Sequence, residues 1–207
     1  MMSIAQFEDF KSRADEVRSF IERVVARAPS IGEAAMDRAA AVLFIYNLME
    51  AGARGVGEAI FDAVNVQGIE FDDLAMPLKR ELYDLLRVRN SVKAAREIKR
   101  INRDIYDFAY DPKAVMSGNV DRRKWSERLQ DLGCPGSLPA DPDGLLVRVK
   151  SMRNALAHGH VGFAEGGRDF SVADIQEAYS LAFQMGCKAF EEVKQLIVTG
   201  GLKTTES

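Results

Sequence analysis

One predicted helix of this 207-residue chain carries an arginine, an asparagine and a histidine within six positions. They are Arg153, Asn154 and His158, in the run LLVRVKSMRNALAHG at residues 145–159. A guanidinium binds phosphate groups through charged hydrogen bonds, and an imidazole accepts or donates a proton near neutral pH. These side chains therefore have the chemistry to act on a phosphodiester, although the spacing of Arg and His alone is weak evidence for it.

Apolar residues at helical spacing predict how this run is positioned. They recur at intervals of three, four and seven and form one stripe that should face the core: Leu145, Val149, Met152 and Leu156. Asn154 and His158 lie one turn apart on the remaining surface. Gly159 follows as a residue suited to the left-handed backbone that ends many helices.

The longer run Arg-Asn-Ala-Leu-Ala-His-Gly resembles the motif of the HEPN superfamily. In that superfamily an Arg, usually followed by a polar residue, precedes a His by four to six positions. Further segments resemble the subset found in prokaryotic toxin and defence loci: residues 43–52 (LFIYNLMEAG), 117–121 (SGNVD), 161–163 and 167–175. The resemblance covers about residues 35–198 and implies a small helical domain.

The resemblance implies a metal-independent endoribonuclease that needs no cofactor and acts as a toxin or anti-phage defence effector. It implies a homodimer in which Arg153 and His158 of two chains surround one cleft. Arg153 would bind the RNA phosphate, and His158 would act as acid or base in attack by the ribose 2′-OH. Asn154 would hold a phosphate oxygen or the His tautomer. The partners implied are RNA and an antitoxin or defence ATPase.

Three alternatives stay open at this stage, one of which is that Arg153 and His158 only cap and pair within the helical bundle. The chain could instead be a catalytically silent helical module that binds a partner protein or a nucleotide. His160 is a second candidate acid or base, or a solvent-facing loop residue. A well-known HEPN branch has Tyr two residues after the motif His, whereas this chain has His160, so regulation by nucleotidyl modification of that Tyr does not carry over.

Asn47 and Glu50 are polar residues in a strongly apolar predicted helix that contains AAAVLFIYNLME. Leaving a buried neutral polar group without a partner costs about 1 to 3 kcal/mol, and a charge costs more. We therefore expect both side chains to have partners. They would either hydrogen-bond to a neighbouring helix or support the motif of Arg153 and His158 at a dimer interface.

Positive charge is concentrated in the middle of the chain. Residues 79–153 contain 17 Lys or Arg against 11 Asp or Glu, a net charge of +6, whereas the rest has a net charge of −9. Such a basic region could follow a phosphate backbone, or its residues could simply form solvated helix faces. The candidate RNA contacts are Arg96, Arg100, Arg122, Arg123 and Lys150.

The whole pattern predicts an all-α protein, an up-down bundle of five or six helices forming one domain over residues 1–207. Helices are expected at 4–28, from Ser30 with a capping box to Glu33, at 71–88, at 121–132 and from Ser171 to about residue 198. Gly52, Gly55 and Gly57 could bend or divide the second helix. Residues 160–170 could form a small hairpin, and the tail 201–207 should fray.

Composition excludes several other classes. The chain shows no secretory signal, no apolar run long enough to cross a membrane and no dinucleotide, HExxH or Gly-x-Ser-x-Gly motif, so we expect a cytoplasmic protein. Cys134 and Cys187 lack metal-ligand spacing, which favours free thiols and predicts no metal site. Trp125 is expected in the core.

Overall fold

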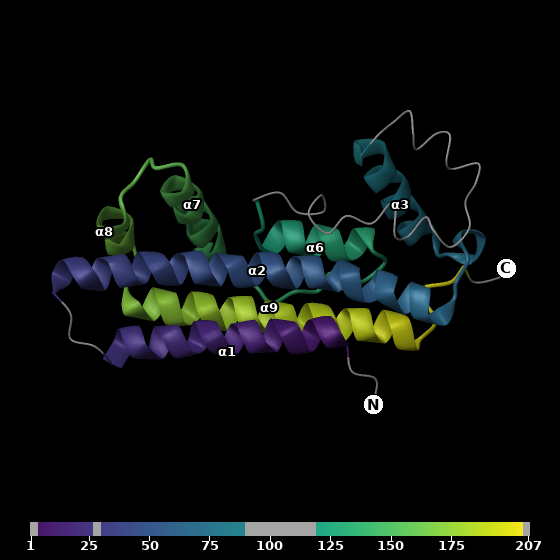
Figure 1. The fold of residues 1–207 in the computed structure, drawn as a ribbon, viewed down its shortest axis with the longest axis horizontal. Coiled ribbons are helices and arrows are strands. Elements are labelled where there is room, and N and C mark those ends of the chain that lie inside the picture. Colours follow the sequence, from purple (N-terminus) through teal and green to yellow (C-terminus); the bar gives the residue numbers. More distant parts are fainter. Residues whose placement is uncertain (1–3, 27–29, 90–118, 205–207) are drawn as a thin grey trace.

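The computed structural model describes residues 4–26, 30–89 and 119–204. Within these ranges the protein has seven α-helices and two short 3₁₀ helices, but no strand (Figure 1). The all-α prediction is confirmed. The helices are α1 (Ala5–Ala26), α2 (Ile31–Gln67), α3 (Met76–Arg89), α6 (Arg122–Asp131), α7 (Leu145–Ala157), α8 (Phe163–Gly166) and α9 (Val172–Val198).

Three long helices, α1, α2 and α9, lie side by side and form the core (Figure 1). α1 runs antiparallel to both of its neighbours, whereas α9 runs in the same direction as α2. Phe10 of α1 and Phe190 of α9 meet with ring centroids 5.8 Å apart. A Cβ at Gly186 would lie only 2.0 Å from the Phe10 ring, so α1 and α9 approach closely where α9 has no side chain.

α2 is one uninterrupted helix of 37 residues, so the expectation that its glycines could divide it is not met. The predicted capping box is present, because Ser30 and Glu33 exchange hydrogen bonds at the first turn. Gly52 and Gly55 are buried at positions where side chains from other helices pack against the backbone of α2. A Cβ at Gly52 would lie 2.7 Å from the Trp125 ring, and one at Gly55 would lie 3.1 Å from Phe190. These glycines thus serve close packing.

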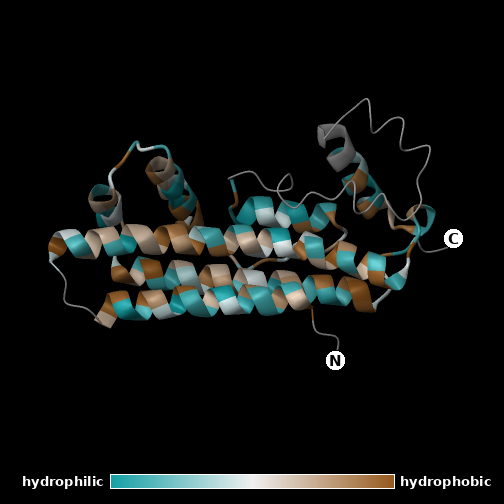
Figure 2. Ribbon diagram, viewed as in Figure 1, coloured by the Kyte–Doolittle hydropathy of each residue, from teal (hydrophilic) through white to brown (hydrophobic). Residues whose placement is uncertain are grey.

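The shorter helices α3, α6, α7 and α8 stand on the side of α2 away from α1 (Figure 1). α6 is mostly hydrophilic on its visible side, while the middle of α2 beneath it is mostly apolar (Figure 2). In α7, Leu145, Val149 and Leu156 of the predicted stripe are buried, together with Leu146. α7 begins where both carboxylate oxygens of Asp141 accept backbone N–H groups, those of residues 145 and 146, at 2.8 and 3.0 Å.

The segment after α7 is helical, so the expected hairpin is wrong. It forms α8 and then the 3₁₀ helix η3 (Gly167–Asp169), and it packs against the start of α2. Arg38 Nε donates a hydrogen bond to the Gly167 carbonyl at 2.9 Å. A Cβ at Gly167 would lie 1.7 Å from the Ala35 carbonyl oxygen. Gly167 thus permits the backbone to lie directly on α2, while a Cβ at Gly166 would lie 2.6 Å from the Met152 sulfur of α7.

The tail does not fray from residue 201 as expected. Leu202 is fully buried, and Leu74 and Lys203 form an isolated antiparallel bridge. Thr204 donates its backbone N–H to the Asp73 carbonyl at 2.8 Å and its hydroxyl to the Leu74 carbonyl at 2.7 Å. The apolar Leu202 explains the difference, because burying it fixes the tail against the 3₁₀ helix η1 (Phe71–Asp73) and the residue that follows.

Candidate active site

Arg153 projects from α7 onto α2, where it makes three contacts. Its guanidinium carbon lies 4.6 Å from the centre of the Tyr46 ring. Its Nη2 lies 3.8 Å from Glu50 Oε1, and its Nη1 donates a hydrogen bond to Asn154 Oδ1 at 3.0 Å. The Arg153 side chain keeps 25% of its surface exposed and that of Glu50 keeps 22%. The guanidinium is thus held in place and remains open to a ligand.

Tyr46 is a fully buried residue beneath Arg153 that the sequence reasoning missed. Its hydroxyl accepts the backbone N–H of Val120 at 3.0 Å, and the Glu50 carboxylate lies near enough to influence it. Burial, followed by the negative charge of Glu50, raises the pKa of Tyr46 to about 12. The available signal was the spacing of Tyr46 and Glu50, four residues apart and therefore on one helix face.

The segment just before α6 closes the site on a second side. Asn154 Nδ2 lies 3.5 Å from Asn119 Oδ1, at the limit of a hydrogen bond. Lys150 Nζ lies 2.5 Å from Asp121 Oδ2, and Asp121 Oδ1 also accepts the backbone N–H of Lys124 in the first turn of α6, at 2.9 Å. Although burial alone would raise it, the hydrogen bond from Lys150 keeps the pKa of Asp121 below its ordinary value. Residues 119–121 are part of the SGNVD segment that carried the family resemblance.

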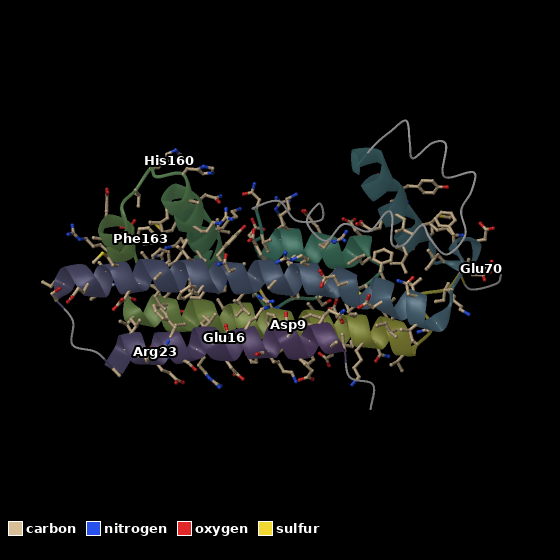
Figure 3. All side chains as sticks on the ribbon, viewed as in Figure 1. Asp9, Glu16, Arg23, Glu70, His160 and Phe163 are labelled. Carbon is tan, nitrogen blue, oxygen red and sulfur yellow. The ribbon has the colours of Figure 1, made fainter. Side chains whose placement is uncertain are left out.

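His158 and His160 are both exposed on the loop between α7 and α8. His158 ends α7, and Gly159 follows with a left-handed φ of 69°, as its position predicts. The two imidazole rings lie 5.8 Å apart between centroids, and Figure 3 shows His160 at the outer end of the loop. No hydrogen bond joins the described side chains of His158 and Arg153, so the chain by itself gathers Arg153, Asn154 and Glu50 and leaves the imidazoles open to solvent.

Asn47 does not share the position of Glu50. Its side chain is exposed, so the expectation that it needs a partner within a buried environment is wrong. The reason is that Asn47 lies on the face of α2 that the other described helices leave uncovered. Glu50, one turn later, turns toward α7 and contacts Arg153. Two uses were expected for Glu50: hydrogen bonding to a neighbouring helix, or support of the motif at a dimer interface. The structure shows a contact with Arg153, a motif residue on the neighbouring helix α7.

The candidate RNA contacts divide into three groups. Arg122 donates hydrogen bonds to the carbonyls of Pro139 and Leu138, at 2.6 and 3.0 Å, and Lys150 pairs with Asp121, so both side chains have partners within the chain. Arg123 is well exposed and pairs only with Glu127, one turn later on α6. Arg96 and Arg100 lie outside the described residues.

No cluster of three or more His, Cys, Asp or Glu side chains able to hold a metal ion occurs in the described ranges. Both cysteines are free thiols, Cys134 buried and Cys187 partly buried. Among the described helices, none has the length and apolar composition that a membrane span requires. The functional groups in and near the candidate site are a guanidinium, a carboxylate, amides and two imidazoles.

Comparison with known proteins gives the family. A family model described as HEPN_MAE_28990-like HEPN matches residues 2–185, which is most of the chain. The protein therefore belongs to the HEPN superfamily. Within that superfamily it falls in the MAE-type group, in agreement with the resemblance seen in the sequence. Searches among curated proteins and solved structures found no match.

Proposed function

We propose that the protein is a metal-independent endoribonuclease that cleaves RNA by attack of a ribose 2′-OH on the adjacent phosphorus. The observation that carries this proposal is the position of Arg153. Its guanidinium lies over the Tyr46 ring, beside Asn154, with part of its surface exposed. A fixed, accessible guanidinium suits binding of a phosphate whose charge increases in the transition state.

The remaining chemistry needs groups that move protons, and His158 supplies one. It lies one helical turn beyond Asn154 on the same helix and is exposed to solvent. An imidazole can take the proton from the 2′-OH or give one to the departing 5′-oxygen. The products are a 2′,3′-cyclic phosphate and a 5′-hydroxyl, and DNA is inert because it lacks the 2′-OH.

We propose further that the active unit is a homodimer, as family membership suggests. A two-fold axis near the outer side of α7 would bring a second Arg153 and His158 to the same cleft. The exposed imidazoles and the exposed Asn47 on α2 are available for such an interface. In cells this activity fits a cytoplasmic toxin or defence effector that an antitoxin or a defence ATPase keeps inactive.

The direct test is incubation of the purified protein with total RNA in EDTA, beside Arg153→Ala and His158→Ala. We expect cleavage by the wild type, and losses of about 10²-fold or more in both variants, because each removes a group that acts in the transition state. Both variants should keep the helical circular dichroism and the oligomeric state of the wild type. Cleavage that persists in both variants would contradict the proposal.

A second candidate function has one observation in its favour. Arg153 is already engaged by Glu50 and Asn154, and the described His158 side chain is not bonded to it. The same surface therefore also suits a non-catalytic module that binds a partner protein or a nucleotide. Binding of RNA without cleavage over hours in EDTA would favour this module, whereas cleavage that requires His158 would exclude it.

A further inference from the structure

Glu50 is the carboxylate that contacts Arg153, and it lies at the accessible edge of the site. Its Oε1 is 3.8 Å from Arg153 Nη2, and the carboxylate is 22% exposed. Glu50 also lies near the buried hydroxyl of Tyr46, which accepts the Val120 N–H and so keeps its own proton to donate.

We propose that Glu50 is the general base of the cleavage reaction, which leaves His158 as the general acid. This inference rests on the ribonuclease function proposed above. A phosphate bound to the Arg153 guanidinium would sit within a few ångströms of Glu50, because the charged ends of the two side chains are only 3.8 Å apart. The ribose attached to that phosphate then places its 2′-OH where a carboxylate can reach it.

The step balances without any further reactant. The Glu50 carboxylate takes the proton of the 2′-OH while the 2′-oxygen forms a bond to phosphorus. The bond between phosphorus and the 5′-oxygen breaks, and the imidazolium of His158 gives its proton to that oxygen. Arg153 neutralises the charge on the non-bridging oxygens as it grows. The enzyme leaves the cycle with a protonated carboxyl and a neutral imidazole, which solvent resets.

This division of roles explains why the site contains a carboxylate beside its arginine. Near neutral pH a carboxylate is ready to accept a proton, and an imidazolium is ready to donate one. Asp121, the other carboxylate close to the motif, is committed elsewhere, since it pairs with Lys150 and caps α6. Among the described residues, the contact that Glu50 makes is with Arg153, beside the neighbouring Tyr46.

The test is Glu50→Gln, which keeps the shape and the acceptor for Tyr46 but removes the basic oxygen. We expect kcat to fall by about 10²-fold or more, as for other general bases, with KM within about threefold of wild type because Arg153 still binds the phosphate. In a plot of kcat against pH, the decrease at low pH (the acid limb) should disappear in Glu50→Gln. The decrease at high pH (the alkaline limb) should disappear in His158→Gln instead. Tyr46→Phe, which loosens the base, should lower kcat by about tenfold and keep both limbs.

Glu16→Gln is the matched control, because Glu16 is an exposed glutamate of α1 on the opposite side of the bundle from His160 (Figure 3). It should cleave like the wild type. Glu50→Asp keeps a carboxylate, and we expect a lower kcat with the acid limb present. If Glu50→Gln does not fold, this variant tests whether Glu50 is the general base.

Two results would overturn the assignment: a near-normal kcat in Glu50→Gln, or a raised KM with kcat and both limbs unchanged, which would mean that Glu50 only positions Arg153. In either case cleavage would still require Arg153 and His158. If instead cleavage survives their removal, the ribonuclease function itself fails.

Discussion

Among the described residues, two arginine–glutamate pairs that join helices differ in exposure. Arg128 of α6 pairs with Glu81 of α3 at 2.5 Å, and their side chains are only 8% and 10% exposed. Arg153 of α7 and Glu50 of α2 are 3.8 Å apart, with side chains 25% and 22% exposed. The first pair is closed to solvent, whereas the second lies open above the Tyr46 ring.

The comparison shows that the same two residue types serve different purposes according to burial. In the closed pair, both side chains are cut off from solvent, and Nε and Nη2 of Arg128 have no hydrogen-bond partner among the described residues. In the open pair, Arg153 has partners on several sides and keeps an accessible surface. Removing one partner of the buried pair leaves a charge without compensation, whereas water can still solvate the partner left in the open pair.

The largest effect on stability should come from breaking the closed pair. Arg128→Ala leaves Glu81 buried without its cation, which typically costs about 3 to 5 kcal/mol of unfolding free energy. Arg153→Ala should cost only about 1 kcal/mol, because a partly exposed pair contributes little. Denaturant unfolding of both variants measures the difference. Equal losses of unfolding free energy in the two variants would mean that burial does not distinguish the two pairs.

A second prediction concerns the residue beneath the open pair. The pKa of Tyr46 is raised from 10.0 to about 12, so the folded chain keeps a proton that the unfolded chain loses near pH 10. The stability due to this shift is complete below pH 10 and is lost as the pH rises to about 12, an effect of about 2 to 3 kcal/mol. The stability difference between wild type and Tyr46→Phe should narrow by that amount over this range in denaturant unfolding. If the difference in unfolding free energy between the two proteins stays constant over this pH range, folding does not raise the pKa of Tyr46.

A third prediction tests how firmly the loop bearing the histidines is held on the open side. Gly167→Ala would place a Cβ 1.7 Å from the Ala35 carbonyl oxygen, so η3 and the end of α8 must move away from α2. We expect a loss of about 1 to 3 kcal/mol, typical of overpacking. Gly162→Ala is the control, because a Cβ there meets nothing within 4 Å. Thermal unfolding compares them, and equal midpoints would argue against this contact.

The smallest effect on stability belongs to a third pair, Arg123 with Glu127, whose side chains are 68% and 43% exposed. Arg123→Gln should change the unfolding free energy by less than about 0.5 kcal/mol. If Arg123 contacts RNA, the variant should lower the slope of log affinity against log salt by about 0.7, the value for one phosphate of a single strand. Filter binding at several salt concentrations measures the slope. An unchanged slope would remove Arg123 from the candidate interface.

Much of the fold was predictable because helix signals are local. Ser30 with Glu33 and Ser171 with Asp174 form the two capping boxes that open the longest helices, and both follow from the sequence spacing. The burial of Trp125 was equally predictable from its place on the apolar side of a short helix. These features depend on residues a turn or two apart.

The errors arise where distant segments meet. Gly52 looked like a break in α2, yet it is where Trp125 packs against the helix. Gly167 looked like part of a hairpin, yet it lets α8 lie on Ala35, about 130 positions earlier. Tyr46 was hidden in an apolar run, and only the fold shows that Val120 and Arg153 meet at its ring and hydroxyl. Such contacts join residues far apart in the chain and leave no local pattern.

Trp125 is the single tryptophan of the chain, and its fully buried indole lies between α6 and α2. Its fluorescence emission should therefore be that of an apolar environment and should shift to longer wavelength when these helices separate. One intrinsic fluorophore can thus monitor unfolding in every variant proposed above.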